Sequence, residues 1–517
     1  MTLVTGSDPV HRYHDGTKHH FHRFAPSLGY LDWASQPTPF RSFAGARDIP
    51  LAPRPDAHPS TAAIGDLLRH ALGLSAWKDN GHARWPLRVN PSSGNLHPTE
   101  AYVVLAPLAG VTERAGVYHY APDRHALEQR CAFDGDPPLL VALTSIHWRE
   151  AWKYGERAFR YCQHDLGHAI AALGYAAALG GNTLTMDPQW SHGAIAALTG
   201  IDRDQDFVDA EREAAECALI VASLKPQVPG RVSSPGELLK AVAVGCWTGR
   251  ASQLSDDHVQ WTFIDEIAQA TEDPGRTIAA DHPPIQLPNY PITQLPDRRV
   301  LLQRRSALAF DGRSSIDGDR FFAMLAATLP AGGPPFDALW WDPRIHLALF
   351  VHRVEGFDPG LYLLPRDAAA AGRLRAALGR EFEWQAVTAS LPLLRLARGD
   401  CRRLAMRVSC DQDIASDGFF SLGMIADFDA SLDAFGPSFY RHLFWESGVV
   451  GQALYLAAET AGARATGIGC FYDDPMHDVL GLSGHALQSL YHFTVGMPVE
   501  DPRLTTQTGY EWERLRL

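Results

Sequence analysis

The feature that most constrains the fold is an order of predicted elements that repeats in the two halves of the chain. Each half predicts a long alanine-rich helix, a segment of small residues, a short helix and an apolar strand. These elements cover about 148–180, 183–186, 192–199 and 217–223 in the first half, and 448–463, 467–471, 475–482 and 490–496 in the second. We interpret the pattern as a diverged internal duplication, which differs from the short periodic repeats of a solenoid.

The length of 517 residues exceeds one typical core, and we expect two domains. The predicted strands follow one another as meanders between long helices, without the regular βαβ alternation of a doubly wound sheet. The expected class is therefore α+β, with an antiparallel sheet flanked by long helices in each domain. We place an N-terminal arm at 1–60, the first domain at 61–224, a proline-rich connecting segment at 225–299 and the second domain at 300–517.

Composition disfavours several classes of function. Hydrophobic residues make up 46% of the chain, yet no window approaches the roughly 18 consecutive apolar residues of a membrane-spanning helix. The first residues lack a basic segment followed by an apolar one, so we expect no secretory signal and a cytoplasmic location. A net charge of −13 disfavours nucleic acid, because contacts with phosphates need a concentrated basic surface. The expected partner is a small molecule or a peptide, with no membrane and no nucleic acid.

The sequence predicts neither a disulfide framework nor a metal site. The seven cysteines are odd in number and widely scattered, with no Cys-x-x-Cys pair. Several histidines gather within residues 1–30, but no ligand set at a settled spacing accompanies them. Cys470 follows a glycine-rich segment, and there we expect a small core residue in preference to a redox thiol.

The segment from Arg88 to Pro98 is the clearest candidate for a site. Prolines fix its backbone near both ends, and Gly94 permits the close approach of another group. Hydrogen-bonding side chains are dense within it, namely those of Arg88, Ser92, Ser93, Asn95 and His97. From these residues alone two interpretations stay open: a loop that holds a cofactor, and an ordinary surface turn before the apolar strand at 101–105.

Several motifs together resemble the nitroreductase superfamily of FMN proteins, and within it the SagB/ThcOx-type dehydrogenases in a tandem-domain form. They cover roughly residues 60–224 and 300–503. The motifs are Arg88-x-x-Pro-Ser-Ser-Gly-Asn-x-His-Pro98, Lys153-Tyr154-Gly155 with Arg157 and Arg160-Tyr161, Asp165-x-Gly-His168, Arg304-Arg305-Ser306, Gly467-Ile468-Gly469 and Val495-Gly-Met-Pro498. The resemblance implies two nitroreductase-like domains that form an intramolecular pseudo-dimer, and it leaves a further homodimer open.

In that family each flavin lies between two subunits. One subunit gives a Pro-Ser-Ser-x-Asn loop to the isoalloxazine ring, and the other gives an Arg-Arg-Ser segment to the phosphate and a glycine-rich loop beside the ring. Here the first half has the ring-side loop and the second half has the other pieces, which implies one composite FMN site and a degenerate second one. The implied cofactor-binding residues are Arg88, Pro91, Ser92, Ser93, Gly94, Asn95, His97, Arg304, Arg305, Ser306, Gly467, Ile468, Gly469 and Arg503.

One position departs from the family pattern. Leu308 stands where the family has a third basic residue after the Arg-Arg-Ser segment. We expect Arg41 or Arg313 to replace that residue at the phosphate, or the phosphate to be bound more weakly.

Lys153 and Tyr154 match the Lys-Tyr pair that azoline-oxidising relatives place near the flavin, and they are the expected catalytic residues. A lysine whose pKa is lowered by burial can take the proton that leaves when a substrate hydride passes to flavin N5, and a phenol can relay it. The ordinary alternative is an amphipathic helix start with its lysine in water.

The helix that follows carries two further sets of charged residues at helical spacing. Such spacing brings side chains to one face, where they can pair. Asp165 is expected to pair with His168, in a structural or a catalytic role. Arg157 and Arg160 are expected to pair with Glu150 and Glu156, and the alternative is that they hold an acidic group of a substrate.

The expected activity is FMN-dependent dehydrogenation of a peptide-derived or small-molecule substrate, in the manner of an azoline oxidase. Two alternatives remain: NAD(P)H-dependent reduction of nitro compounds or quinones, and a non-catalytic flavin-binding scaffold in a peptide-maturation complex. The Lys153-Tyr154 pair favours dehydrogenation. The absence of a dinucleotide fingerprint decides nothing, since this fold binds nicotinamide over the flavin without one.

Overall fold

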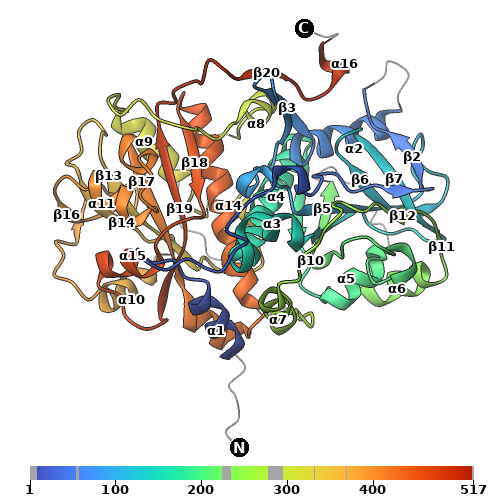
Figure 1. The fold of residues 1–517 in the computed structure, drawn as a ribbon, viewed down its shortest axis with the longest axis horizontal. Helices are drawn as coiled ribbons and strands as arrows, with labels where there is room; N and C mark the ends of the chain where they lie inside the picture. Colours follow the sequence, from blue (N-terminus) through green and yellow to red (C-terminus); the bar gives the residue numbers. More distant parts are fainter. Residues whose placement is uncertain are drawn as a thin grey trace, which may run out of the picture.

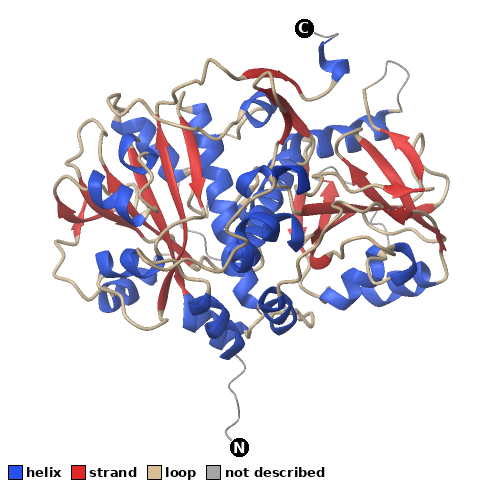
Figure 2. Ribbon diagram, in the orientation of Figure 1, coloured by secondary structure: helices blue, strands red, loops and turns tan. Residues whose placement is uncertain are grey.

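The protein is described by a computed structural model for residues 8–53, 58–223, 234–277, 295–330, 332–367 and 369–514. Two antiparallel sheets stand on opposite sides of the molecule, and long helices lie between them (Figures 1 and 2). The chain is thus α+β, with two tandem domains joined by a helical interface, as the sequence predicts.

The first sheet is built by β2 (Arg47–Pro50), β5 (Thr99–Leu105), β6 (Ala115–Ala121), β7 (Ala126–Phe133), β8 (Leu140–Ser145), β9 (Asn182–Met186), β10 (Ala214–Ser223) and β11 (Cys246–Trp247). Its order is β11-β7-β6-β5-β8-β10-β9, with β2 also paired to β7. Strands β5, β6 and β8 are buried along their whole length, which explains their nearly continuous runs of apolar and small residues.

The second sheet is built by β13 (Ile345–Val351), β14 (Gly360–Leu364), β15 (Gln385–Ala386), β16 (Leu394–Arg398), β17 (Phe420–Asp427), β18 (Arg464–Ile468) and β19 (Leu487–Gly496). Its order is β15-β16-β14-β13-β17-β19-β18. The last six strands of this order, from β16 to β18, therefore repeat the order β7-β6-β5-β8-β10-β9 of the first sheet. This shared topology is the structural form of the predicted duplication.

Two helices of 22 residues, α4 (Ala158–Leu179) and α14 (Phe439–Thr460), form the centre of the interface. Both are apolar around most of their circumference and buried along nearly all of their length, as expected of helices inside a large core. A Cβ placed on Gly167 of α4 would lie 2.8 Å from the Cα of Gly448 of α14. The two backbones can approach this closely because neither residue has a side chain. In the described part of the chain, no helix has the length and apolar character needed to cross a bilayer.

The remaining helices lie around the two sheets and beside the central helices, with α3 next to α4 in the middle of the molecule (Figure 1). They are α1 (Asp8–Gly16), α2 (Pro59–Ala71), α3 (His147–Tyr154), α5 (His192–Thr199), α6 (Pro235–Ala243), α7 (Thr262–Ala270), α8 (Arg298–Gln303), α9 (Gly318–Ala326), α10 (Ala370–Ala377), α11 (Arg402–Val408), α12 (Ile414–Asp417), α13 (Phe428–Phe435), α15 (Asp473–Leu480) and α16 (Glu511–Arg514). Short 3₁₀ turns lie at Trp33–Ser35, Ser93–Asn95, Gly155–Arg157, Asp204–Asp206 and Phe336–Ala338.

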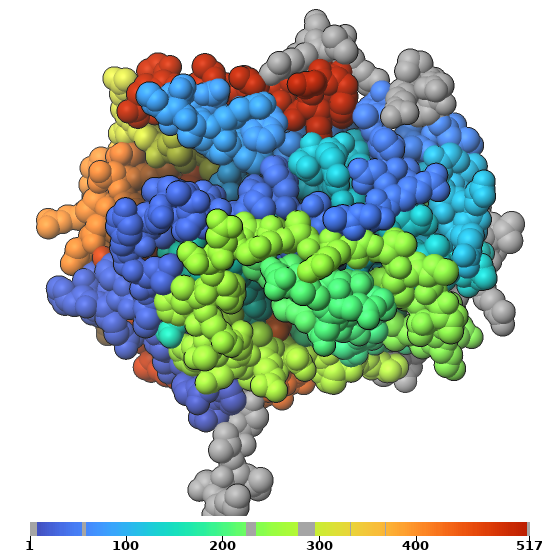
Figure 3. All heavy atoms as spheres, turned by 45° about the vertical axis from the view of Figure 1, so that its right-hand side comes forward, coloured from blue at the N-terminus to red at the C-terminus, as the bar shows by residue number. Residues whose placement is uncertain are grey.

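Both ends of the described chain cross to the opposite half. Near the N-terminus, His14 Nε2 lies 2.9 Å from Gln488 Oε1 of the second sheet. The N-terminal segment, dark blue in Figure 3, lies across the surface of the molecule. Near the C-terminus, β20 (Thr505–Thr508) pairs with β3 (Leu74–Asp79), which in turn pairs with β4 (Arg84–Arg88). These exchanged ends join the two domains into one intramolecular pseudo-dimer.

The expected connecting segment at 225–299 is in part a component of the first domain. Strand β11 extends the first sheet, and β12 (Arg250–Ala251) pairs with β1 (Phe43–Ala44) of the N-terminal segment. Helices α6 and α7 also lie within residues 234–277. Most of the proline-rich stretch from 282 to 296 lies outside the described residues.

Candidate functional site

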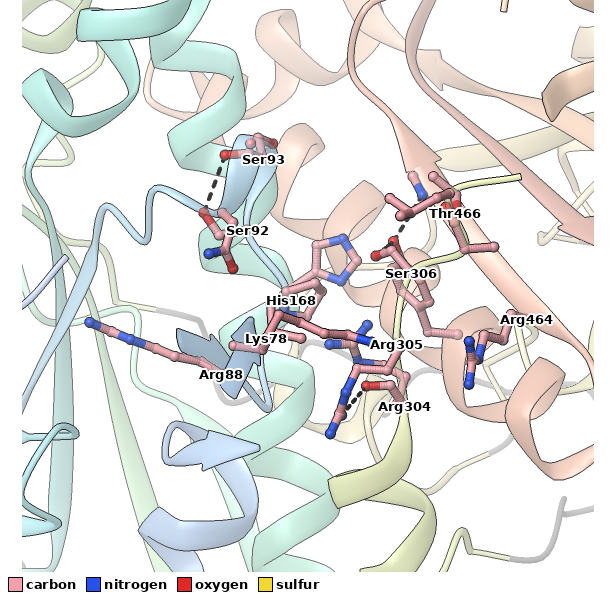
Figure 4. A pocket seen from close by; sticks show the side chains of 18 of the residues that line it. Lys78, Arg88, Ser92, Ser93, His168, Arg304, Arg305, Ser306, Arg464 and Thr466 are labelled. Atoms are coloured by element: carbon pink, nitrogen blue, oxygen red, sulfur yellow. Dashed lines mark hydrogen bonds between the residues drawn. The ribbon is translucent and has the colours of Figure 1, made fainter. Parts of the chain in front are cut away.

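A cavity of about 360 Å³ lies between the two halves. From the first half it is lined by Lys78, Trp85, Leu87, Arg88, Pro91, Ser92, Ser93, Gly94, Asn95, His97, Asp165 and His168. From the second half it is lined by Arg304, Arg305, Ser306, Ala307, Leu308, Tyr455, Arg464, Thr466, Gly467, Tyr491, Val499, Glu500, Asp501 and Leu504. The fold therefore brings the 91–97 loop and the Arg304-Arg305-Ser306 segment, more than 200 residues apart in sequence, to one cavity (Figure 4).

One end of the cavity is crowded with positive charge. Arg304 and Arg305 meet Lys78 of β3 and Arg464, the first residue of β18 (Figure 4). Burial and, next, the neighbouring Arg304 lower the pKa of Arg305 to about 9, which leaves it protonated at neutral pH. Burial, Arg305 and Arg464 likewise lower the pKa of Lys78, against an opposing effect of Glu500. Like charges held this close favour the binding of an anion.

Within this cationic group, Arg304 is the residue whose surroundings most clearly indicate a bound anion. Its side chain is 4% exposed and lies over the ring of Tyr455, 4.8 Å from the centroid. Among the described residues, its Nε and Nη1 atoms have no hydrogen-bond partner. Because an unpaired buried donor is costly, these two donors fit a bound oxyanion such as a phosphate.

The two arginines named as substitutes for Leu308 do not reach this end of the cavity. Arg41 is fully buried in the first domain, where its Nε lies 3.3 Å from Glu213 Oε1. Arg313 is exposed and does not line the cavity. Arg464 and Lys78 supply the additional positive charge instead, so that part of the expectation is wrong.

The loop at 91–97 forms the opposite end of the cavity. Gly94, Asn95 and His97 all have positive φ, at 60°, 62° and 54°. For Asn95 and His97 this backbone is uncommon, and strain of this kind concentrates at functional sites. The loop is held from within, because Asn95 Oδ1 lies 3.0 Å from His97 Nε2 and the His97 amide donates to Ser92 Oγ at 2.8 Å. It is therefore a rigid structure, which the interpretation as an ordinary turn does not predict.

Two buried carboxyl groups anchor this loop from behind. The amide and the hydroxyl of Ser93 both donate to Asp165 Oδ1, at 3.0 and 3.1 Å, and Ser92 Oγ lies 3.3 Å from Glu150 Oε1. Asp165 and Glu150 also influence each other's pKa. Burial raises the pKa of Asp165 to about 7, and burial together with the charge of Asp165 raises that of Glu150 well above its usual range. The pair therefore retains a proton near neutral pH.

Lys153 and Tyr154 end helix α3 on the far side of Gly94. They do not line the cavity. A Cβ on Gly94 would lie 2.6 Å from the Tyr154 hydroxyl and 3.2 Å from Lys153 Nζ, so the glycine lets the loop lie against both side-chain tips. Burial lowers the pKa of Lys153, and it raises that of Tyr154 well above its usual range. Lys153 is thus suited to give up and take a proton, whereas Tyr154 stays a hydrogen-bond donor.

The glycine-rich segment at the end of β18 is close-packed against aromatic side chains. A Cβ on Gly467 would lie 2.1 Å from the Tyr491 hydroxyl, and one on Gly469 would lie 2.2 Å from the ring of Tyr161. Gly467 lines the cavity, but Ile468 and Gly469 do not. These glycines therefore serve close packing at the interface, and one of them also faces the cavity.

Two of the expected cofactor residues have other surroundings. The Arg503 side chain is 84% exposed, pairs with Asp501 at 2.7 Å and does not line the cavity. Arg88 borders the cavity, but its guanidinium points away from it (Figure 4) and donates to the Thr99 and Pro39 carbonyls. Arg88 thus fixes the position of the loop within the first domain.

The expected pairs along this helix are replaced by a contact with the loop at 91–97 and by contacts with the second half. Asp165 binds Ser93, while His168 lies 3.2 Å from Gln452 Oε1 and 3.3 Å from the Tyr491 hydroxyl. Arg157 and Arg160 each lie 2.8 Å from Asp473 of α15, and their expected pairing with Glu150 and Glu156 is wrong. Helical spacing favours local partners. At this buried interface, however, the two arginines pair with Asp473, which is more than 300 residues away in the sequence.

The equivalent location in the second half has different surroundings. Glu446 occupies the position in α14 that Asp165 occupies in α4, and it accepts the amide of Arg344 at 3.1 Å. The loop it holds carries the buried apolar residues Phe336, Leu339 and Trp341 in place of serines and asparagine. A nearby cavity of about 270 Å³ is lined mostly by apolar side chains, and Arg320 is the one charged residue among its described lining residues. No cationic group comparable with that of Arg304 is present there among the described residues.

Sequence reasoning missed several residues of the candidate site, among them Lys78, Arg464, Glu150 and Tyr455. Lys78 comes from a strand with no motif of its own, so nothing local identified it. Arg464 lies three residues before Gly467, and Glu150 lies three residues before Lys153 on one helix. The last two spacings are signals that could have been used.

Comparisons with known proteins agree with this architecture. No family model matches the chain. A protein of Methanocaldococcus jannaschii described as a nitroreductase is 30% identical over 93 residues, 15% of this chain and less than half of that relative, at 46%. A solved structure from Anabaena variabilis ATCC 29413, described as a nitroreductase, has a TM-score of 0.67 at 21% identity and covers 95% of this chain and 99% of its own. Another from Ralstonia eutropha JMP134 covers 39% of this chain and 82% of its own, at 16% identity and a TM-score of 0.28.

The likeness over nearly the whole chain shows the fold. The protein has the nitroreductase fold, present as two tandem domains in one polypeptide.

Proposed function

We propose that the protein is an FMN-dependent oxidoreductase of the SagB/ThcOx type, with one composite flavin site between its two halves. The observation that carries the proposal is the cavity in which Arg304 and its basic neighbours face the strained loop at 91–97. A phosphate group favours arginine forks and a serine hydroxyl, whereas an isoalloxazine ring needs neutral donors and flat apolar surfaces. The cavity offers both kinds of surroundings at its two ends.

The residues that line the cavity fit the two parts of FMN, its phosphate and its ring. Arg304, Arg305 and Ser306, with Arg464 and Lys78, would hold the phosphate, and the partnerless donors of Arg304 are the clearest sign of that role. The loop at 91–97, His168 and Gly467 would border the ring. Burial lowers the pKa of His168 to about 3, so it adds no charge to that end. When bound, the flavin would supply a two-electron acceptor for a hydride taken from a substrate.

The chain's own residues would handle the accompanying proton. Lys153 Nζ lies against Gly94, and burial lowers its pKa, which favours the neutral amine that a general base needs. Tyr154 stays protonated and would orient the substrate or relay the proton by its hydroxyl. Glu150, three residues before Lys153, and Asp165 retain a shared proton behind the loop. This arrangement supports dehydrogenation of a peptide-derived or small-molecule substrate, by an azoline-oxidase-like reaction.

The test is anaerobic reduction of the protein reconstituted with FMN. The loss of flavin absorbance, or bleaching, measures the reduction. We expect an azoline-containing peptide to bleach the flavin, and NADH or NADPH to bleach it slowly or not at all. Rapid bleaching by NAD(P)H without any bleaching by the azoline would favour a reductase of nitro compounds or quinones. A protein that binds FMN but responds to neither would favour a non-catalytic scaffold.

Substitution of Lys153 tests its proposed role as the general base, and bound FMN shows that the variant has folded. Lys153→Ala should slow bleaching by about 100-fold or more while FMN stays bound, since a general base typically contributes about 10²–10⁴-fold. Lys240→Ala is the matched control, because Lys240 is exposed on α6. Equal rates for Lys153→Ala and the unmodified protein would remove Lys153 from the mechanism.

A further inference from the structure

Three metal-ligating side chains meet outside the cavity already described. His19 comes from the N-terminal segment, Cys410 from the turn between α11 and α12, and Cys470 from the segment after β18. Cys470 Sγ lies 2.8 Å from Cys410 Sγ and 3.7 Å from His19 Nδ1, and all three ligand atoms lie within 4.8 Å of one another. We propose that His19, Cys410 and Cys470 bind a zinc ion.

The distances suit such an ion after a small side-chain adjustment. Zinc bonds of about 2.3 Å to sulfur and about 2.0 Å to nitrogen, at tetrahedral angles, place a thiolate about 3.5 Å from an imidazole nitrogen and about 3.8 Å from a second thiolate. The Cys470–His19 distance of 3.7 Å already fits. The two sulfur atoms must separate by about 1 Å, and both cysteines are only half-buried, so their side chains have room to rotate.

The backbone holds the imidazole in place. The amide of His19 donates to Asp473 Oδ2 at 2.8 Å, and the amide of Asp473 donates to the His19 carbonyl at 3.1 Å. Asp473 is itself fixed by Arg157 and Arg160. The Cys470 carbonyl accepts from Gln412 Nε2 at 3.0 Å. A ligand set that is already oriented loses less entropy on binding a metal.

The nearby carboxylates already bind other partners. The fourth coordination position of the proposed zinc ion would therefore be open to water. Asp411 accepts from the Tyr472 hydroxyl at 3.0 Å and pairs with Arg407 at 2.7 Å. Asp473 is occupied by the two arginines and by His19. Two cysteines, one histidine and an open position are one of the ligand sets known for zinc. The bound ion would fasten the N-terminal segment to the second domain.

Sequence reasoning predicted no metal site, and the spacing explains why. His19 and Cys470 are 451 residues apart, and the two cysteines are 60 apart. A ligand set assembled from three distant segments has none of the short spacings by which zinc sites are recognised in sequence.

Titration of the reduced, tag-free protein with Co²⁺ tests the site, because tetrahedral cobalt bound to thiolates has a characteristic absorption spectrum. We expect one equivalent to bind, with a thiolate-to-metal band that an equivalent of Zn²⁺ removes. Cys410→Ser, Cys470→Ser and His19→Gln should each weaken binding by more than about 100-fold, since even the loss of supporting groups around a metal costs about 10–100-fold. Cys246→Ser, at an exposed cysteine of β11, should bind as the unmodified protein does.

Circular dichroism of each variant shows whether it has folded. A folded Cys470→Ser protein that keeps the cobalt band would overturn the proposal. So would an unmodified protein that gives no band, including one in which mass spectrometry without reductant finds Cys410 and Cys470 joined as a disulfide and no metal is taken up after reduction.

Discussion

Gly167 and Gly448 occupy equivalent positions in α4 and α14, and they face each other where the two helices cross. A Cβ on either residue would lie 2.8 Å from the Cα of the other. The pseudo-two-fold relationship between the domains therefore passes through two residues without side chains. The composite cavity depends on this close crossing, because Asp165 and His168 of α4 and Tyr455 of α14 all line it.

Substitution at this crossing should weaken the joining of the two halves. In Gly167→Ala the new methyl group would meet the Trp445 carbonyl oxygen, 2.1 Å from the ideal Cβ position, so the helices must shift apart. We expect a loss of about 1–3 kcal/mol in the free energy of unfolding, measured by urea denaturation. Gly372→Ala on α10 is the control, because no described atom lies within 4 Å and alanine should stabilise the helix by about 0.5–1 kcal/mol. Equal stability of the two variants would contradict the close crossing.

The clamp between Asp473 and two arginines should matter more than surface pairs. Asp473→Asn leaves Arg157 and Arg160 buried without their carboxylate, and we expect a loss of about 3–5 kcal/mol. The arginines hold the pKa of Asp473 far below its usual range, so this stabilisation is present above the unfolded-state pKa and is lost as the solution becomes acidic. Asp400→Asn, at an exposed pair with Arg402, should cost less than about 1 kcal/mol. Similar losses of stability in the two variants would show that the buried clamp contributes no more than the exposed pair.

The buried pair of Asp165 and Glu150 predicts a pH dependence of the opposite sign. The pKa of Asp165 is raised to about 7 in the folded protein, so the unfolded chain releases its proton at lower pH. Stability should therefore decline as pH rises from about 4 to about 7, by at most about 4 kcal/mol for this group. Asp165→Asn should flatten that decline in urea denaturation curves recorded across this range. A decline of unchanged slope in the variant would show that Asp165 is ionised throughout.

The fold was largely predictable, because the order of elements in the two halves depends on local sequence. Meandering strands, long helices and the duplication all follow from the periodicity of apolar residues. The contacts between the halves do not, since the sequence near Arg157 favours Glu150 and Glu156 and carries no sign of Asp473. The pairing of β11 with β7 of the first sheet, within the expected connecting segment at 225–299, could not be predicted for a similar reason, since it depends on a tertiary contact.

The candidate site was predictable in its motifs and not in its geometry. The Arg304-Arg305-Ser306 segment and the loop at 91–97 are recognisable as residue patterns, and the fold brings both to one cavity. Lys78 could not be found, because β3 meets the second half through tertiary contacts alone, such as its pairing with β20 and the bond from Arg305 to the Ser75 carbonyl. Arg503 was expected at the phosphate, but in the folded protein its side chain is exposed and pairs with Asp501.

The phosphate end of the cavity can be tested by comparing two ligands. Arg304→Ala should weaken FMN by about 10–100-fold, as expected for the loss of hydrogen bonds to a charged group, and should change riboflavin little. Arg503→Ala should change either affinity by less than about threefold, because an exposed ion pair contributes little. Quenching of flavin fluorescence measures both affinities. An equal loss of FMN and riboflavin affinity in Arg304→Ala would place that arginine away from the phosphate.

The most direct measurement is the ratio of flavin to chain. The protein is saturated with FMN, unbound flavin is removed, and the flavin released by denaturation is compared with the protein concentration. One composite site predicts a ratio near one, because the second half carries the buried apolar residues Phe336 and Trp341 where the first half has the serines and asparagine of the loop at 91–97. A ratio near two would contradict the account, and so would a protein that retains no FMN after reconstitution.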